Sequence, residues 1–220
     1  MATSTVENYI KEIYLEHQRS GRELVSLGRL AAALSVVPGT VTTMVKALAE
    51  AKLVRYEPRH GVKLTSSGQK LALHVLRRHR LVELFLVRVL DVDWSEVHVE
   101  AEDLEHAISD KLLTRIDEFL GRPQFDPHGD PIPSATGKVS KRDLVPLSVC
   151  ESSRRMRIAW LADQDAHFLR YAQKHGLTPG AMVKVEARDA VGDSITIVVE
   201  GRVAITLGTA AAEKIMLAPT

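Results

Sequence analysis

The sequence predicts a mainly α-helical protein with a β-rich C-terminal tail. Two observations predict this fold class. Up to residue 120, apolar side chains recur at three- and four-residue steps, which is the period of an amphipathic helix. From about Leu144 the pattern changes to short strand-like runs separated by turn residues, which is typical of a small antiparallel barrel.

The first 64 residues predict three helices and a hairpin. The first helix, residues 5–17, carries apolar side chains on one face and ends before Gly21. A second helix, residues 27–34, has Ser26 as a candidate N-cap, and residues 36–39 form a turn. A third helix follows at 40–52, and strands at 53–56 and 62–64 flank a turn with a basic tip. This arrangement is that of a winged helix-turn-helix.

The third helix and the hairpin tip favour DNA as the partner. Short hydroxyls can reach phosphates or base edges, and a lysine can neutralise a phosphate. The alternative is a helix-turn-helix that makes only protein contacts. The candidate DNA-binding residues are Gly39, Thr40, Thr42, Thr43, Lys46, Arg59 and His60.

The rest of the chain predicts a helical domain and a β-domain. Thr65 to Gly68 cap a long helix that runs to Leu90, and further helices are expected at 97–113 and 115–120. A segment rich in Pro and Gly, residues 121–137, ends this domain. Strands expected at 156–161, 182–187, 195–200 and 203–206, with a helix at 166–175, form an SH3-like barrel. The predicted domains are 1–72, 73–140 and 141–220, with a linker at about 134–146.

Charge is divided unevenly along the chain, although the net charge is only +1. Residues 1–80 carry +7, residues 81–140 carry −8 and residues 141–220 carry +2. A basic N-terminal part followed by an acidic central part suits a nucleic-acid-binding surface next to a cation site. The alternative is that the charges are unevenly distributed by chance. The chain has no apolar run of membrane-spanning length and no signal-like N-terminus, and its single cysteine, Cys150, is expected to be inert. A reducing cytoplasm is the expected setting.

Potential metal ligands gather on two helices. His79 and Glu83 are four residues apart and share a face. On the later helix, one arc carries four more candidates. They are His98, Glu102, Glu105 and His106. Imidazole and carboxylate without thiolate suit Mn, Fe, Co, Ni or Zn.

Other interpretations of these residues stay open. The pair at 79 and 83 can be a surface ion pair, and the later cluster can be a solvated acidic helix face. A carboxylate and a histidine can also serve a metal-dependent hydrolase, but the sequence has no nucleophile elbow, phosphate-binding loop or zinc-protease motif. A metal-independent winged-helix regulator that senses a small organic ligand is the second rival. The remaining histidines are expected to be ordinary surface or turn residues: His74, His128, His167 and His175.

The chain resembles the diphtheria toxin repressor family, which includes iron-dependent repressors and manganese transport regulators. The resemblance covers nearly the whole chain. It rests on VENYIKEIY (6–14), VPGTVTTMVKAL (37–48), KLTSSG (63–68), RRHRLVE (77–83), VHVEAEDLEH (97–106) and GDPIP (129–133). It implies a homodimeric, non-enzymatic repressor that binds double-stranded operator DNA when loaded with metal and controls metal-homeostasis genes. Neither a membrane nor a small organic substrate is expected as a partner.

The resemblance also implies two metal sites. The primary site comprises Glu102, Glu105 and His106, completed by Asn8 from the first helix. The ancillary site comprises His79, Glu83 and His98, with Asp165 as the best match for a ligand from the tail and Asp163 as the fallback. Metal at the primary site would hold the first helix and so set the spacing of the two winged helices in a dimer.

Two departures bear on the choice of metal. Iron-type members of the family have Cys where Glu102 stands and Met where Asn8 stands, whereas manganese-type members have Glu and Asp. A hard carboxylate suits manganese better than a soft thiolate does. Mn²⁺ is therefore the expected cofactor and Fe²⁺ the alternative, with Zn²⁺, Co²⁺, Ni²⁺ or Cd²⁺ able to bind in vitro. Thr43 stands where other members often have Gln or Lys, so the operator sequence does not carry over.

Overall fold

The computed structural model describes residues 3–151 and 154–219. The chain folds into two compact units. The first comprises the residues up to His79, together with Glu105–Ala107 and Pro133–Lys138. The second comprises Arg80–Leu104, Ile108–Ile132 and the chain from Val139 onward. The predicted division into three domains at 72 and 140 stays a prediction.

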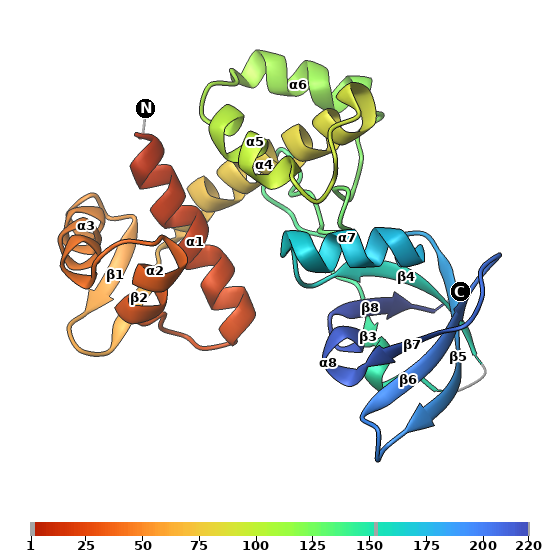
Figure 1. The fold of residues 1–220 in the computed structure, drawn as a ribbon. Coiled ribbons are helices and arrows are strands. Elements are labelled where there is room, and N and C mark those ends of the chain that lie inside the picture. The colour runs from red at the N-terminus through yellow and green to blue at the C-terminus, as the bar shows by residue number, and fades with distance from the viewer. Residues whose placement is uncertain (1–2, 152–153, 220) are drawn as a thin grey trace. The chain divides into compact units, whose positions relative to one another are not determined.

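The first unit holds three helices, a hairpin and the first part of a fourth helix, residues 66–79 (Figure 1). α1, Ser4–Ser20, begins at the Thr3 cap and ends at Gly21 in the left-handed conformation. α2, Leu27–Ala33, begins at Ser26, whose hydroxyl accepts a hydrogen bond from the Arg29 amide as the sequence predicts. β1, Val54–Glu57, and β2, Gly61–Leu64, pair antiparallel. Together with α3 these elements form the predicted winged helix-turn-helix.

α3 begins two residues earlier than predicted. It spans Pro38–Glu50, so Pro38 and Gly39 lie in its first turn and not in the preceding turn. Proline is well tolerated there because the first amide of a helix has no partner within the helix. Val41, Val45 and Leu48 face the core of the unit, which they share with Ile10 and Ile13 of α1.

α4, Ser66–Leu90, begins next to the Thr65 hydroxyl, which accepts a hydrogen bond from the Gly68 amide. The next two helices differ from the prediction. α5, Val97–Glu105, ends eight residues early, and α6, Asp110–Phe119, begins five residues early. Ser109 causes the second difference because its side chain caps α6 by accepting from the Leu112 amide.

The C-terminal part of the second unit is an antiparallel six-stranded sheet in the order β3-β8-β4-β5-β6-β7. Its strands are β3 (Val145–Pro146), β4 (Arg155–Leu161), β5 (Met182–Asp189), β6 (Ser194–Val199), β7 (Ile205–Gly208) and β8 (Ile215–Ala218). The predicted SH3-like class is confirmed, although the sequence missed β3 and β8 and placed β7 two residues early. Residues alternate between buried and half-buried along β6, as expected for a sheet with one face in the core.

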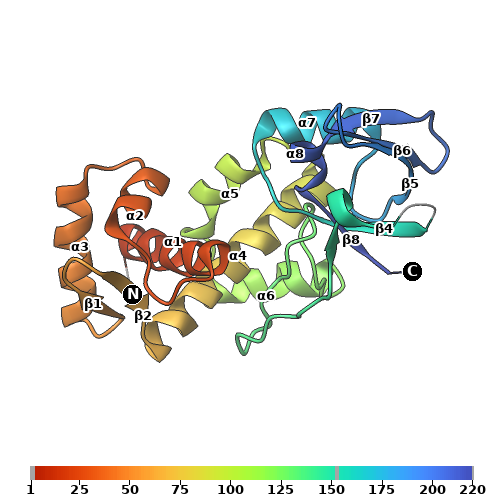
Figure 2. The ribbon, with the colours of Figure 1, turned by 90° about the horizontal axis from the view of Figure 1, so that it is seen from below.

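Two helices complete this sheet domain. α7, Ala166–His175, matches the predicted helix and packs Phe168, Leu169 and Ala172 into the core. The short α8, Thr209–Ala212, contacts β6 and β7 (Figure 2). A 3₁₀ turn, η1 (Leu147–Val149), follows β3 and buries Leu147.

Residues 126–130 of the Pro/Gly-rich segment, which was predicted only to end the helical domain, are folded against the sheet. The Asp126 amide donates to the Asp130 carbonyl, so residues 126–130 form a closed loop. The Leu161 amide of β4 donates to the His128 carbonyl. Gly129 has φ +91°, and a Cβ there would lie 2.2 Å from the Ala159 carbonyl oxygen, so the close approach to β4 requires glycine.

No single helix within residues 3–151 and 154–219 has the length and apolar character needed to cross a membrane. α2 and α3 meet a length and composition criterion only together, as a pair bent by 111°. That pair is the helix-turn-helix.

Candidate metal centres and nucleic-acid interface

The exposed face of α3 carries most of the residues predicted to contact DNA. Gly39, Thr40, Thr43 and Lys46 are exposed, and Thr42 is half-buried. The Thr42 hydroxyl donates to the Pro38 carbonyl and the Thr43 hydroxyl donates to the Gly39 carbonyl. These bonds use the hydroxyl hydrogens within the helix, and each hydroxyl oxygen can still accept a hydrogen bond.

The hairpin tip carries the other two residues of the predicted DNA surface. Arg59 and His60 are both exposed, and the His60 amide donates to the Glu57 carbonyl to close the turn. Arg59 adopts φ 69°, a left-handed conformation that a tight turn can require. Lys63, on β2, forms an ion pair with Glu23.

Glu105 is the centre of a buried charge cluster in the first unit. Its side chain is fully buried at the end of α5. One carboxylate oxygen lies 2.8 Å from Lys11 Nζ of α1, and the other lies 2.6 Å from His79 Nδ1 of α4. Burial alone would raise the pKa of Glu105, but the hydrogen bonds and charges of His79 and Lys11 outweigh it, so the pKa is lowered. Glu105 is therefore held as a carboxylate, the form that binds metal.

His106 connects the same cluster to the start of α1. Its Nδ1 lies 2.7 Å from a Glu7 carboxylate oxygen, and its Nε2 lies 2.7 Å from Asn8 Oδ1. Nε2 is also 3.3 Å from Glu105 Oε1. Three of the four residues predicted for the primary site thus lie together, with oxygen and nitrogen donors that suit a divalent cation.

Sequence reasoning did not identify Glu7 and Lys11 as part of this cluster. Glu7 is buried and also lies 3.5 Å from Arg78. Glu7 and Lys11 are four residues apart and therefore share one face of α1, and Asn8 lies three residues before Lys11. That spacing was the available signal.

The second unit holds three more of the predicted metal ligands, on α4 and α5: Glu83, His98 and Glu102. His98 Nδ1 lies 3.3 Å from Glu83 Oε1, and His98 Nε2 lies 3.7 Å from Glu102 Oε1. Glu83 is buried, whereas the His98 side chain is half exposed. This imidazole is thus shared between a carboxylate of α4 and one of α5.

A further cluster in this unit was not predicted at all. Ligand atoms of Glu83, Asp126 and His128 all lie within 4.8 Å of one another, and all three residues are buried. His128 was expected to be an ordinary surface or turn residue; it does lie in a turn, but it is buried and not at the surface. It is fully buried because the loop folds onto β4, its Nε2 lies 2.8 Å from the Trp94 carbonyl, and its ring stacks on Trp94.

The donor atoms of this cluster fit a cation. Asp126 Oδ2 and His128 Nδ1 are both buried without a hydrogen-bond partner. Burial, together with the charges of Asp130 and Glu83, raises the pKa of Asp126 well above its ordinary value, and Arg80 opposes this shift. Two carboxylates and an imidazole packed this closely are stabilised by a divalent ion or a proton.

The two residues expected from the tail have structural roles. Asp165 is exposed and caps α7 by accepting from the His167 and Phe168 amides. Asp163 forms an ion pair with Lys214 at 2.6 Å, which contributes to lowering its pKa against the effect of burial. Their assignment to the ancillary site stays a prediction. Cys150 is buried, and burial raises its pKa, in keeping with an inert thiol.

The chain matches three family models in sequence along its length. They are the iron-dependent repressor N-terminal DNA-binding domain (residues 1–62), the iron-dependent repressor metal-binding and dimerisation domain (65–134) and the FeoA domain (145–219). A solved manganese-dependent transcriptional repressor in complex with manganese is 38% identical, covers 98% of this chain and 100% of its own, and superposes with a TM-score of 0.87. The chain belongs to the iron-dependent repressor family.

Two curated relatives agree with this assignment. An HTH-type transcriptional regulator of Methanocaldococcus jannaschii is 36% identical over 118 residues, which is 54% of this chain and 94% of the relative. The iron-dependent repressor IdeR of Mycobacterium tuberculosis is 29% identical over 215 residues, 92% of each chain. The predicted resemblance is confirmed, and the family is one of DNA-binding repressors, which are not enzymes.

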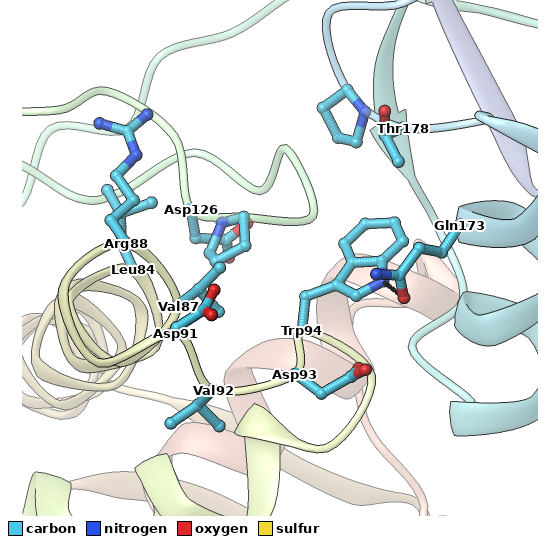
Figure 3. A pocket seen from close by; sticks show the side chains of 12 residues that line it. Leu84, Val87, Arg88, Asp91, Val92, Asp93, Trp94, Asp126, Gln173 and Thr178 are labelled. Carbon is cyan, nitrogen blue, oxygen red and sulfur yellow. Dashed lines mark hydrogen bonds between the residues drawn. The ribbon is translucent and has the colours of Figure 1, made fainter.

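The pocket in Figure 3 bears on the rival regulator that senses an organic ligand. This family member has a pocket of about 580 Å³ in its second unit, and its lining includes Arg88, Asp91 and Asp93 (Figure 3). Trp94 also lines the pocket and donates from Nε1 to Gln173 Oε1 at 2.9 Å. That rival predicts an apolar pocket, but charged and polar groups line much of this one, which therefore gives the rival no support.

Proposed function

We propose that this repressor binds operator DNA as a homodimer when divalent metal occupies its primary site. The observation that supports this most strongly is the contact between His106 Nε2 and Asn8 Oδ1, with Glu105 Oε1 next to the same nitrogen. It connects α1, a helix of the DNA-binding head, to the end of α5. A cation held by these donors would supply electrostatic attraction across the junction, and it would favour whichever arrangement of the head holds the donors together.

The proposed primary ligands are Asn8, Glu102, Glu105 and His106. Glu102 lies one helical turn before Glu105 on α5, so both carboxylates project from neighbouring turns. Glu7 is not one of the proposed ligands. Its carboxylate accepts a hydrogen bond from His106 Nδ1, which orients the imidazole and leaves Nε2 for the cation.

A second ion is proposed for Glu83, Asp126 and His128. The support is their mutual proximity, their burial and two buried donor atoms without a hydrogen-bond partner, of which Asp126 Oδ2 lies 3.6 Å from Arg80 Nε. Glu83 also belongs to the ancillary set inferred from the sequence, namely His79, Glu83 and His98 with Asp165 or Asp163. Because a carboxylate has two oxygens, Glu83 can bind an ion together with Asp126 and His128 or an ion at the ancillary site.

Manganese is the proposed physiological metal, with iron(II) as the alternative. Both proposed sites offer carboxylate and imidazole but no thiolate, and the primary site adds the amide oxygen of Asn8; these donors suit Mn²⁺. Similar solved structures are a manganese-dependent transcriptional repressor in complex with manganese and the repressor ScaR with bound Cd²⁺ or Zn²⁺. The regulated genes are proposed to be those of metal homeostasis, and the setting to be the cytoplasm.

Metal-dependent DNA binding tests this function. A duplex selected from a random library by the Mn²⁺-loaded protein would be titrated with the full chain at fixed free Mn²⁺. We expect Mn²⁺ to tighten binding at least about tenfold, since coupling of roughly 1–3 kcal/mol is usual for a ligand-driven switch. His106→Ala should abolish the response, whereas the matched variant His167→Ala, at an exposed position on α7, should retain it. Failure of the wild type to bind Mn²⁺, or a full response by His106→Ala, would overturn the proposal.

A further inference from the structure

A buried lysine lies against the carboxylate that we propose as a metal ligand. Lys11 Nζ donates a hydrogen bond to Glu105 Oε1 at 2.8 Å. The two side chains are only 5% and 0% exposed, so solvent screens this ion pair poorly. His79 engages the other oxygen, Oε2, at 2.6 Å. Both oxygens of the proposed ligand are therefore held by basic groups of the chain itself.

The same oxygen is the one that faces His106. Glu105 Oε1 lies 3.3 Å from His106 Nε2, which in turn contacts Asn8 Oδ1 at 2.7 Å. A divalent cation held by these three donors would have to share Oε1 with the Lys11 ammonium. Two positive charges on one buried oxygen repel strongly because little water screens them. The ammonium and the cation therefore compete for Glu105.

We propose that Lys11 is a built-in competitor that lowers the affinity of the primary site for metal. The inference rests on the proposed function, since it takes Glu105 as a metal ligand. Lys11 neutralises the buried carboxylate until a divalent ion displaces the ammonium, whose flexible four-carbon stem allows it to turn away. The residue thereby raises the free metal concentration at which the repressor responds.

Substitutions of Lys11 test the competition through Mn²⁺ affinity, measured by equilibrium dialysis of the full chain without DNA. Lys11→Met keeps the length of the side chain and removes the charge. We expect it to bind Mn²⁺ at least about tenfold more tightly than the wild type, because removing one unit charge at short range in a buried site has an effect of this order or larger. Lys11→Arg keeps the charge and should bind like the wild type. Lys63→Met, which removes another ion-paired lysine, is the matched control and should leave the affinity unchanged.

A second measurement needs no substitution. Acetylation by an amine-reactive ester, followed by peptide mass spectrometry, reports how accessible each lysine is. Lys11 should be modified severalfold faster with saturating Mn²⁺ than without metal, while Lys63 should be modified equally in both. This measurement decides the matter if Lys11→Met does not fold.

The outcomes separate the two proposals. If the wild type binds no Mn²⁺, the proposed function fails and the competition fails with it. If the wild type binds Mn²⁺ but Lys11→Met binds it no more tightly, only the competition is overturned. Slower or unchanged labelling of Lys11 in Mn²⁺ would also overturn it, because the ammonium would then stay on Glu105.

Discussion

Trp160 on β4 donates a hydrogen bond from its indole nitrogen to Asp130 Oδ2 at 3.0 Å. Gln164 donates to the same oxygen at 2.9 Å, and Arg80 of α4 donates to Oδ1 at 2.8 Å. One buried carboxylate therefore joins the helical part of the second unit to its sheet through the loop at residues 126–130. The loop that carries His128 is held in place by this carboxylate.

Asp130→Asn should destabilise the second unit. The amide keeps the shape of the side chain, but it removes the charge opposite Arg80. It also replaces one acceptor oxygen with an NH₂ group, which cannot accept from the donors that surround this side chain. We expect a loss of about 2–3 kcal/mol, the scale for a buried charged hydrogen-bond network. Both tryptophans lie in this unit, so urea unfolding followed by tryptophan fluorescence reports on it directly. Asp143→Asn, at an exposed position, is the control, and equal midpoints for the two variants would contradict the prediction.

Gly129→Ala should destabilise the same loop by steric conflict. A Cβ at this position would lie 2.2 Å from the Ala159 carbonyl oxygen and 2.8 Å from Trp160 Cα, both backbone atoms. Gly180 has a similar φ of +97° but open space around it, so Gly180→Ala tests backbone strain alone. We expect about 1 kcal/mol of destabilisation for Gly180→Ala and clearly more for Gly129→Ala, measured by thermal unfolding. Equal losses would show that β4 yields to the added methyl group.

Asp126→Asn should have opposite effects on metal binding and on stability without metal. Burial and the charges of Asp130 and Glu83 raise the pKa of Asp126 although Arg80 opposes the shift, so the carboxylate is disfavoured there when no metal is bound. The neutral amide should leave the melting temperature in EDTA unchanged or raise it. In Mn²⁺, equilibrium dialysis should find one ion fewer per chain than in the wild type. An unchanged ion count would remove Asp126 from the proposed second site.

Lys46→Ala should weaken DNA binding in a salt-dependent way. Lys46 is exposed on α3, the helix that carries most of the residues predicted to contact DNA. If it contacts a phosphate, the slope of log affinity against log salt should become shallower by about 0.9. The comparison variant is Lys184→Ala on β5. A slope that matches the wild type would place Lys46 away from the phosphates.

Phe119→Glu should disrupt the proposed homodimer. Phe119 on α6 is 71% exposed although it is a large aromatic residue, and Leu112 on the same helix is 50% exposed. Exposed apolar residues gathered on one element are typical of a protein interface. Sedimentation should show a monomer for Phe119→Glu. Val203→Glu, at an 82% exposed position between β6 and β7, should remain dimeric, and a dimeric Phe119→Glu would exclude this face of α6.

Local signals predicted the elements that local interactions build. Ser26 caps α2, the Thr65 hydroxyl accepts from the Gly68 amide at the start of α4, and Gly21 ends α1, each as expected from residue type. The break between α5 and α6 was missed because the apolar pattern continues across it. Ser109 was the signal, since serine before an acidic residue is a typical helix start. β3 and β8 were missed because they are short and each pairs with strands distant in the sequence.

The two clusters of potential ligands contain contacts that the sequence could not predict. Helical spacing can place Glu102, Glu105 and His106 on neighbouring turns, but it cannot show which residue of another helix meets them. The resemblance supplied Asn8 and said nothing of Glu7 or Lys11. His128 lies in a segment rich in Pro and Gly, where no periodicity indicates burial.

By itself, the sequence determined the winged helix-turn-helix, the β-rich tail, the family and the residue types available for metal binding. These follow from periodicity, capping and motifs, which act over a few residues or recur as written patterns. Only the tertiary structure placed Lys11 on Glu105 and brought Asp126 and His128 to Glu83. These contacts depend on helix packing and on a loop that Asp130 and β4 hold in place. Contacts between residues distant in the sequence leave no pattern in the local sequence.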